Sequence, residues 1–174
     1  ALATTDRGKG TAVYRTIAKG LRLGRPFSVF ARHADADVMK TQKLKYCAWH
    51  EMHQLYGFVR FRELKSGILF SEIHPKNHVI AYLADHFSDR FPSEHFLIYD
   101  SGRKLFAVHE AHRQWFLARD THFERENVEE SGEEKLYQEL FRHFCHKIAI
   151  EARENKMLQR SMLPLRFRHH MTEF

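Results

Sequence analysis

The chain has 174 residues, about the length of one globular domain, and 15 of them are Phe. So many aromatic rings must be buried, which excludes a wholly disordered chain. The net charge of +6 is unevenly spread: residues 1–65 carry 13 Lys/Arg against 5 Asp/Glu, and the remainder carries 15 against 17. A basic end favours a polyanionic partner, whereas the competing interpretation is a merely soluble basic protein.

The two cysteines, Cys47 and Cys145, are too few for a disulfide framework and form no CxxC pair. No apolar run approaches the roughly 20 residues that span a bilayer, and no secretory leader opens the chain. We therefore expect a cytoplasmic protein without membrane contact. Because the chain begins at Ala1 and not at Met, we also expect that further N-terminal sequence precedes it.

A first helix is predicted over residues 11–23, where Val13, Ile17 and Leu21 recur four apart and form a stripe. A second, longer helix is predicted over residues 35–56. Five of its residues can share a buried face: Val38, Leu44, Ala48, Met52 and Leu55. Both helices belong to a helical N-terminal part, residues 11–56.

The ends of the longer helix also carry sequence signals. Asp35 or Asp37 can cap its start, because an Asp side chain accepts from the free N–H groups of the first turn. Gly57 suits the left-handed position just past its end. Cys47 falls near the buried face, where a thiol is normally inert.

The hydrophobic period changes to two after this helix. Residues 58–64 alternate, which predicts a strand with Arg60 and Arg62 on one face. Lys65-Ser66-Gly67 is a turn and residues 68–73 are a second strand, so the two form a hairpin.

A helix over about 78–90 follows, which Asn77 can cap and Pro92 can stop. Its inner face is predicted to carry three apolar residues: Ile80, Leu83 and Phe87. Three more strands are predicted, over 95–99, 104–109 and 114–118.

Short turns such as Asp100-Ser101-Gly102 join antiparallel neighbours. The sheet part, residues 58–118, is therefore predicted to hold an antiparallel sheet of about five strands. With helices packed against it, the chain is predicted to be a single α+β domain over residues 1–174.

The last part of the chain, residues 134–174, is predicted to be a helix and a tail. Residues 119–134 contain seven Asp/Glu and are interpreted as a solvated loop. Residues 134–154 are predicted as an amphipathic helix, with Tyr137, Leu140, Phe141, Phe144 and Ile148 at helical spacing. Residues 155–174 form a basic and aromatic tail.

Several separated segments are familiar together. They are GFVRFREL at 57–64, FSDRFP at 87–92, IYD at 98–100 and, in the tail, LQR, MLPLRF and TEF. On these segments residues 12–174 resemble a bacterial family of unknown function labelled a probable DNA metabolism protein. The resemblance implies two partners: a radical S-adenosylmethionine protein of DNA modification or repair, and a uracil-DNA glycosylase-like domain to which some members are fused. It implies no catalytic residue, and the chain has neither the three-cysteine motif of a radical enzyme nor a glycosylase's water-activating motif.

Arg60, Arg62 and Lys65 are the strongest candidates for binding nucleic acid. Two arginines at i and i+2 on one strand face lie about 7 Å apart, which suits successive phosphates. The alternative is that they pair with carboxylates such as Glu72 across the hairpin.

Two further basic groups are candidates for phosphate contact. The tail group interleaves with aromatic rings and consists of Arg160, Arg166 and Arg168, beside His169 and His170. The alternative is that Phe167 and Phe174 pack on the core and leave these charges in water. The group at the first helix consists of Arg15, Lys19, Arg22 and Arg25, and its alternative is a solvated face.

Metal and cofactor sites have little support. His50 and His53, like His143 and His146, are three apart, but the HExxH spacing is absent, so no metal is predicted. No GxGxxG, GxxxxGK[ST] or GxSxG occurs, so no cofactor is predicted and no nucleophile is identified.

Three functional hypotheses stay open. The first is an accessory protein of DNA metabolism that binds nucleic acid through its basic residues, and DNA is the nucleic acid that we expect. The second is an enzyme of DNA repair or base modification, which requires a concave site where Glu63, Glu72 or a histidine meets the arginines. The third is a protein-interaction module whose contact is the acidic stretch or an aromatic patch.

Overall fold

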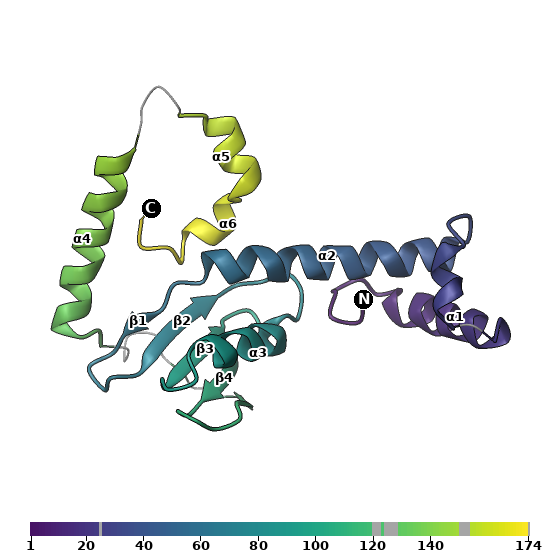
Figure 1. The fold of residues 1–174 in the computed structure, drawn as a ribbon, viewed down its shortest axis with the longest axis horizontal. Coiled ribbons are helices and arrows are strands. Elements are labelled where there is room, and N and C mark those ends of the chain that lie inside the picture. The colour runs from purple at the N-terminus through teal and green to yellow at the C-terminus, as the bar shows by residue number, and fades with distance from the viewer. Residues whose placement is uncertain (25, 120–122, 124–128, 150–153, 174) are drawn as a thin grey trace. The chain divides into compact units, whose positions relative to one another are not determined.

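The computed structural model describes residues 1–24, 26–119, 123, 129–149 and 154–173 (Figure 1). Its backbone contacts divide the chain into a first unit, Ala1–Leu55 with Pro75–Val79, and a second unit, Tyr56–His74 with Ile80–Phe174. The expectation of a single domain stays a prediction. In the described residues no helix has both the length and the apolar character needed to cross a membrane.

The first unit contains the two helices that the sequence predicted, α1 (Lys9–Arg22) and most of α2 (Ala36–Phe58), with a short 3-10 helix, η1 (Pro26–Ala31). The face of α1 that packs is made of small residues, Ala12, Thr16 and Gly20, and not of the apolar stripe. The Thr16 and Thr41 hydroxyl oxygens are 3.0 Å apart. Small side chains let two helices approach closely, and this leaves Ile17 and Leu21 exposed.

The start and the buried face of α2 agree with the prediction. Asp35 caps the helix, since its Oδ1 accepts from the N–H groups of Asp37 and Val38 at 3.0 and 3.3 Å. Four of the five predicted residues are buried and Met52 is half-buried. Two predictions are wrong: Cys47 is exposed, and the helix continues through Gly57 to Phe58 without a left-handed end.

A buried carboxylate holds the segment Pro75–Val79 onto α2. Glu51 is only 3% exposed and accepts from the backbone N–H groups of Lys76 and Asn77 at 2.9 and 2.8 Å. The Asn77 side-chain amide donates to the same carboxylate at 2.7 Å. The Asn77 side chain is thus bonded to α2, although the sequence proposed it as a cap for the following helix.

The second unit is an α+β arrangement around a five-stranded sheet, as predicted, in the order β1-β2-β3-β4-β5. The strands are β1 (Arg62–Glu63), β2 (Leu69–Ile73), β3 (Phe96–Asp100), β4 (Leu105–His109) and β5 (Phe116–Arg119). One neighbour pair departs from the antiparallel prediction, because β2 and β3 are parallel. Helix α3 (Ile80–Arg90) connects them, and such a crossover returns the chain in the same direction.

The predicted hairpin is present but its first strand is short. Only Arg62 and Glu63 pair with β2, and Gly67 takes the left-handed conformation in the turn, with φ of 76°. Phe58 belongs to α2, so residues 58–61 are not the strand that their alternation predicted. Phe61 instead packs edge-on against Phe87 and Phe96, with ring centroids 5.0 and 5.7 Å apart.

Both faces of this sheet carry buried apolar residues. The α3 residues Ile80, Leu83 and Phe87 are buried as predicted, together with Phe96 and Ile98 of β3. A separate aromatic cluster comprises Phe70, Tyr99 and Phe106, with Phe123 packed against it. Apolar packing on both faces therefore holds the central strands of this sheet together.

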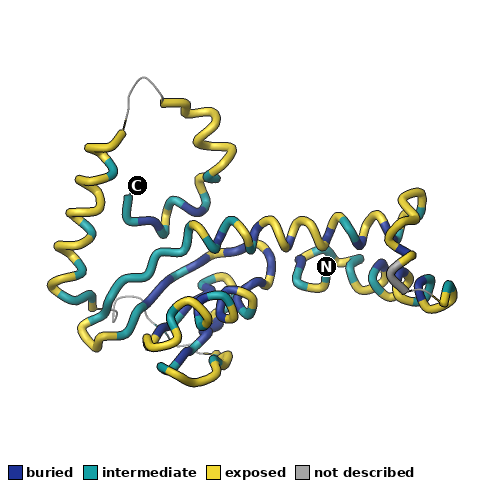
Figure 2. The backbone as a smooth tube through the Cα atoms, viewed as in Figure 1, coloured by how far each residue is buried: buried dark blue, intermediate teal, exposed yellow. Residues whose placement is uncertain are grey.

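Three helices complete the second unit: α4 (Gly132–Ile148), α5 (Lys156–Met162) and α6 (Leu165–Arg168). Ser131 caps α4 by accepting from the Glu134 N–H at 3.0 Å. The predicted helix is confirmed, although it ends at Ile148. Figure 2 shows that α4 is largely exposed along its length.

An aromatic residue near the end of the chain packs against the end of α2. Phe167 is buried and its ring lies 5.6 Å from that of Phe58. The alternative that the tail packs an aromatic ring on the core is therefore confirmed for Phe167, whereas Phe174 lies outside the described residues.

Candidate functional site

The Arg60 guanidinium is hydrogen-bonded within the protein. Its Nη2 and Nε donate to the two carboxylate oxygens of Glu173, at 2.7 and 3.4 Å. Its Nη1 donates to the backbone carbonyls of Gly57 and Val59, at 2.8 and 3.2 Å. Four of the five N–H groups of a guanidinium are thereby used. Arg60 acts as a clamp that ties the C-terminal segment to the residues ahead of β1.

Arg62 and Lys65 are also in ion pairs. Arg62 donates to Glu130 at 2.8 Å and lies over the Phe70 ring, and Lys65 donates to Glu129 at 2.5 Å. That hydrogen bond and the charge of Lys65 lower the pKa of Glu129. Ion pairing was the alternative expected from the sequence, with carboxylates such as Glu72 across the hairpin. The actual partners come from the acidic stretch that was interpreted as a solvated loop.

The basic group on α1 is partly neutralised. Lys19 donates to Asp35 and Asp37 at 2.7 and 2.8 Å, which raises the pKa of Lys19 and, with backbone N–H groups, lowers that of Asp35. Arg15 lies 3.7 Å from Asp37. Arg22 is exposed and in no ion pair with another described residue, and Arg25 lies outside the described residues.

The tail group is divided between surface and core. Arg160 is exposed on α5, whereas Arg166 and Arg168 of α6 are half-buried. The Arg166 guanidinium lies 4.6 Å from the centre of the Phe167 ring. The three predicted basic groups thus have different surroundings, and phosphate binding by them stays a prediction.

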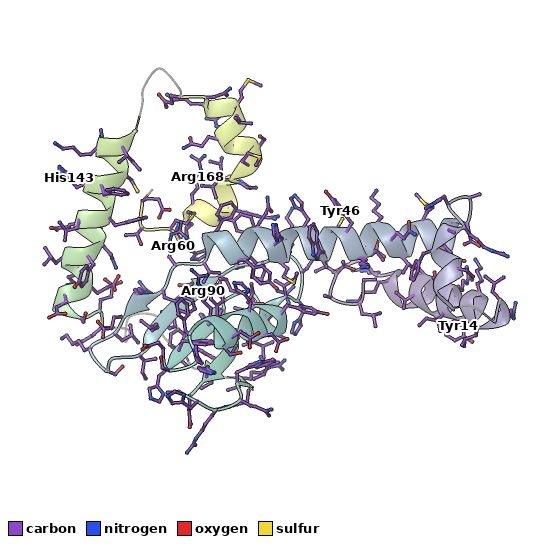
Figure 3. The ribbon with its side chains drawn as sticks, in the orientation of Figure 1. Tyr14, Tyr46, Arg60, Arg90, His143 and Arg168 are labelled. Atoms are coloured by element: carbon purple, nitrogen blue, oxygen red, sulfur yellow. The ribbon has the colours of Figure 1, made fainter. Side chains whose placement is uncertain are left out.

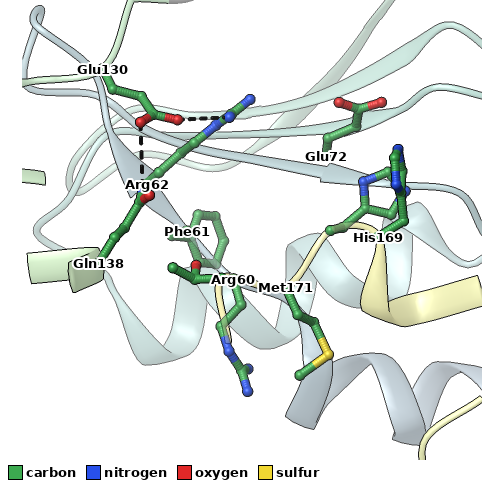
Figure 4. A pocket seen from close by; sticks show the side chains of 10 residues that line it. Arg60, Phe61, Arg62, Glu72, Glu130, Gln138, His169 and Met171 are labelled. Atoms are coloured by element: carbon green, nitrogen blue, oxygen red, sulfur yellow. Dashed lines mark hydrogen bonds and ion pairs between the residues drawn. The ribbon is translucent and has the colours of Figure 1, made fainter. Parts of the chain in front are cut away.

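The second unit has a polar hollow of about 150 Å³ beside β1 and the C-terminal segment (Figure 4). It is lined by Arg60, Phe61, Arg62, Glu72, Glu130, Gln138, His169, His170, Met171 and Thr172. Glu72 and His169 lie on one side, with the Arg62–Glu130 pair on the other. Here the structure brings together a carboxylate, two imidazoles and the arginines, which the sequence named separately. Glu63 is not part of the lining.

This lining can hydrogen-bond a small polar molecule but has no evident metal site. Gln138 donates to Glu134 at 2.8 Å and to Glu130 at 3.4 Å, so its amide is oriented. Across the described ranges, no group of three or more His, Cys, Asp or Glu side chains is placed to hold a metal ion.

The outer face of α2 carries a row of aromatic rings that the sequence analysis did not recognise. The row consists of four rings, and two lysines flank it. The rings are Tyr46, Trp49, His50 and His53, and the lysines are Lys43 and Lys45. Tyr46 is 61% and Trp49 is 49% exposed, and Figure 3 shows Tyr46 projecting from α2 away from α1. The Tyr46 ring centre lies 6.3 Å from that of Trp49 and 5.8 Å from that of His50. Trp49 and His53 are stacked at 5.1 Å with an interplanar angle of 10°.

The lysines flanking this row are exposed. Among the described residues neither Lys43 nor Lys45 is in an ion pair. The whole first unit carries eleven Lys/Arg against four Asp/Glu, a net charge of +7. A signal for this face was available in the sequence: its aromatic residues recur three to four apart, on the side of the helix opposite Leu44, Ala48 and Leu55. His50 and His53 were considered there only as metal ligands.

Comparison with known proteins gives one match. A family model described as a domain of unknown function, DUF4130, matches residues 7–173. No curated protein and no solved structure matches the chain. The match covers both units, and its description names no activity.

Proposed function

Since the chain belongs to the DUF4130 family, we propose its function from its own surface: it binds nucleic acid through the outer face of α2. The observation that carries the proposal is the row of four neighbouring rings, flanked by two lysines that form no ion pair with any other described residue, within a unit of net charge +7. Aromatic rings stack on bases, and lysines neutralise phosphates and release their counterions.

The rings favour a single strand over a duplex. Stacking on a protein ring requires an exposed base face, and in a duplex the base faces are already stacked on one another. Tyr46 and Trp49 present their rings on a convex helix surface, which suits an extended strand lying along α2. We therefore propose single-stranded nucleic acid as the ligand class.

DNA is the proposed polymer, and this step rests on the resemblance of residues 12–174 to a DNA metabolism family. In this proposal the protein is an accessory module: it holds a single strand while a radical S-adenosylmethionine protein or a uracil-DNA glycosylase-like domain acts on it. The α2 face supports the binding step, and the resemblance supports the choice of partners.

The proposal is tested by titrating the protein with a labelled single-stranded oligodeoxythymidine at low and high salt. Trp49→Ala is expected to weaken binding about tenfold or more, because loss of one base stack costs about 1–3 kcal/mol. Tyr14→Ala is the matched control, since Tyr14 is 72% exposed on α1 but lies outside the row of rings. Equal affinity of Trp49→Ala and Tyr14→Ala, or no binding by the unaltered protein at low salt, would contradict the proposal.

A second candidate function is an enzymatic one in the polar hollow. The meeting of Glu72, His169 and the arginines favours it, because general acid–base chemistry needs titratable groups in a concave site. If the hollow is a reaction centre, Glu72→Gln should abolish DNA modification in the presence of the partner enzyme while single-strand binding is unchanged. Full modification by that variant would eliminate this candidate.

A further inference from the structure

Helix α4 has an apolar face that nothing in the described chain covers. None of its 17 residues is buried. Five large apolar side chains on this face are between 40% and 63% exposed: Tyr137, Leu140, Phe141, Phe144 and Ile148. An exposed row of this size on a soluble helix marks an interaction surface, because leaving it in water costs free energy.

These residues repeat every seven positions, the spacing of helices that pack lengthwise against one another. Tyr137 and Phe144 form one row and Phe141 and Ile148 form a second. A third row contains Glu133, Leu140 and Lys147, so it has an acid at its start, a leucine in its middle and a base at its end. Glu133 and Lys147 are exposed, and neither is in an ion pair with another described residue.

The side of α4 that attaches it to the sheet adjoins the apolar face and includes Glu134, which precedes Phe141 by seven positions. The Glu134 carboxylate accepts from the Glu63 backbone N–H at 2.9 Å and from the Gln138 amide at 2.8 Å. Cys145, on the same side, is half-buried. The anchoring contacts therefore leave two rows free to contact another helix, the row of Tyr137 and Phe144 and the row that contains Leu140.

We infer that α4 pairs with α4 of a second copy of this chain, antiparallel, about a twofold axis at Leu140. In this arrangement Glu133 of each copy faces Lys147 of the other, and Tyr137 and Phe144 pack across the interface. A parallel pair would set Glu133 against Glu133 and Lys147 against Lys147, which is repulsive. The charge pattern thus selects an antiparallel, self-complementary interface.

An acid at the start and a base at the end of a helix also interact favourably with the dipole of that helix. Exchanging the charges of Glu133 and Lys147 between two chains separates this explanation from pairing across an interface. The experiment is sedimentation equilibrium of the full chain over a range of concentrations. We expect a reversible dimer. Glu133→Lys and Lys147→Glu are each expected to weaken it about tenfold, because both ion pairs become like-charge pairs.

Mixing the two variants is the decisive arm. A Glu133→Lys chain and a Lys147→Glu chain restore both ion pairs in a heterodimer, so an equimolar mixture should dimerise as tightly as the unaltered protein. If the unaltered protein is a monomer at every concentration, the inference is overturned. It is also overturned if the mixture dimerises no more tightly than either variant alone. Phe144→Gln removes an apolar side chain from the interface, so this variant should stay a monomer where the unaltered protein dimerises. An unchanged helical signal in circular dichroism would show that the variant still folds.

This interface does not depend on the proposed function. Trp49→Ala should leave the dimer intact, because Trp49 lies in the first unit and α4 in the second. Phe144→Gln should leave the intrinsic affinity of each chain for a short oligonucleotide unchanged. The two experiments can therefore fail separately.

Discussion

The two units differ in how they use their charges. The first carries a net charge of +7, and two of the three α2 lysines, Lys43 and Lys45, are in no ion pair with another described residue. The second has 17 Lys/Arg against 18 Asp/Glu, and its two β1-side arginines are held by Glu173 and Glu130. A cluster of cations in sequence therefore does not identify a phosphate site by itself. What matters is whether the fold brings a carboxylate to each cation.

The largest expected effect on the first unit comes from its buried carboxylate. Glu51→Ala leaves the N–H groups of Lys76 and Asn77 without their acceptor, and each buried unsatisfied group costs about 1–3 kcal/mol. The free energy of unfolding should fall by about 3 kcal/mol or more, as measured by urea denaturation. Glu51→Gln keeps one acceptor oxygen and should lose less; equal losses in the two variants would show that hydrogen bonding is not the cause.

In the second unit, the Arg60 clamp should matter for stability and not for binding. Arg60→Ala is expected to lower the free energy of unfolding by about 2 kcal/mol, because it leaves the Glu173 carboxylate, with only 13% of its side chain exposed, without its partner. Affinity for single-stranded DNA should be unchanged. Glu173→Gln should cause a similar loss, and in the double variant the losses should not add. A stable Arg60→Ala protein that no longer binds DNA would reverse the contrast between the units.

The contrast can be sharpened by neutralising two basic side chains in each unit and comparing the salt dependence of binding. Lys43→Gln with Lys45→Gln should reduce the salt dependence of single-strand binding by about 1.4 in log–log slope, about 0.7 for each lost phosphate contact. Arg62→Gln with Lys65→Gln removes the same charge from ion-paired positions and should change the slope little. If Arg62→Gln with Lys65→Gln reduced the slope more than Lys43→Gln with Lys45→Gln, the nucleic-acid site would lie at the hairpin and not on α2.

The sequence predicted most elements of the fold because their signals are local. The α2 face, the α3 face and the central strands follow from local patterns, whereas the alternation over residues 58–61 predicted a strand that is not there. The parallel β2–β3 pair could not be obtained from turn chemistry, since it depends on where α3 returns the chain. The partners of Arg60 and Arg62 were missed for the same reason. Glu173 and Glu130 are 113 and 68 positions away, and no local pattern links residues at that separation.

The α2 outer face was missed for a different reason. Its signal is local, because Tyr46, Trp49 and His53 recur at helical spacing. The search for cations and for metal-ligand spacing did not include uncharged aromatic rings. Arg60 and Arg62, in contrast, satisfied the spacing expected for successive phosphates and were nonetheless used inside the protein. Spacing identifies which side chains can act together, whereas availability depends on the tertiary partners.

The smallest expected effect is the pH response of the half-buried Lys19–Asp35 pair in the first unit. Hydrogen bonds from Lys19 and backbone N–H groups lower the pKa of Asp35 in the folded state. A lowered folded pKa gives stability that is present above the unfolded value, about 3.9, and is lost as the pH falls through the folded value. Lys19 has a raised pKa, so its contribution is lost at the other extreme, as the pH rises above its ordinary value of 10.5.

Between these limits the contribution of the pair to the free energy of unfolding should not change with pH. Thermal unfolding followed from neutral pH down to strongly acidic pH should show a steeper loss of Tm for the unaltered protein than for Asp35→Asn, which has no proton to take up at this position. Added salt should narrow the difference, because a partly exposed pair is screened by ions. Parallel acid profiles for the two proteins would mean that the Lys19–Asp35 pair contributes nothing to folding. Lys19 would then be as open to a phosphate as Lys43 and Lys45, and the first unit's binding surface would extend onto α1.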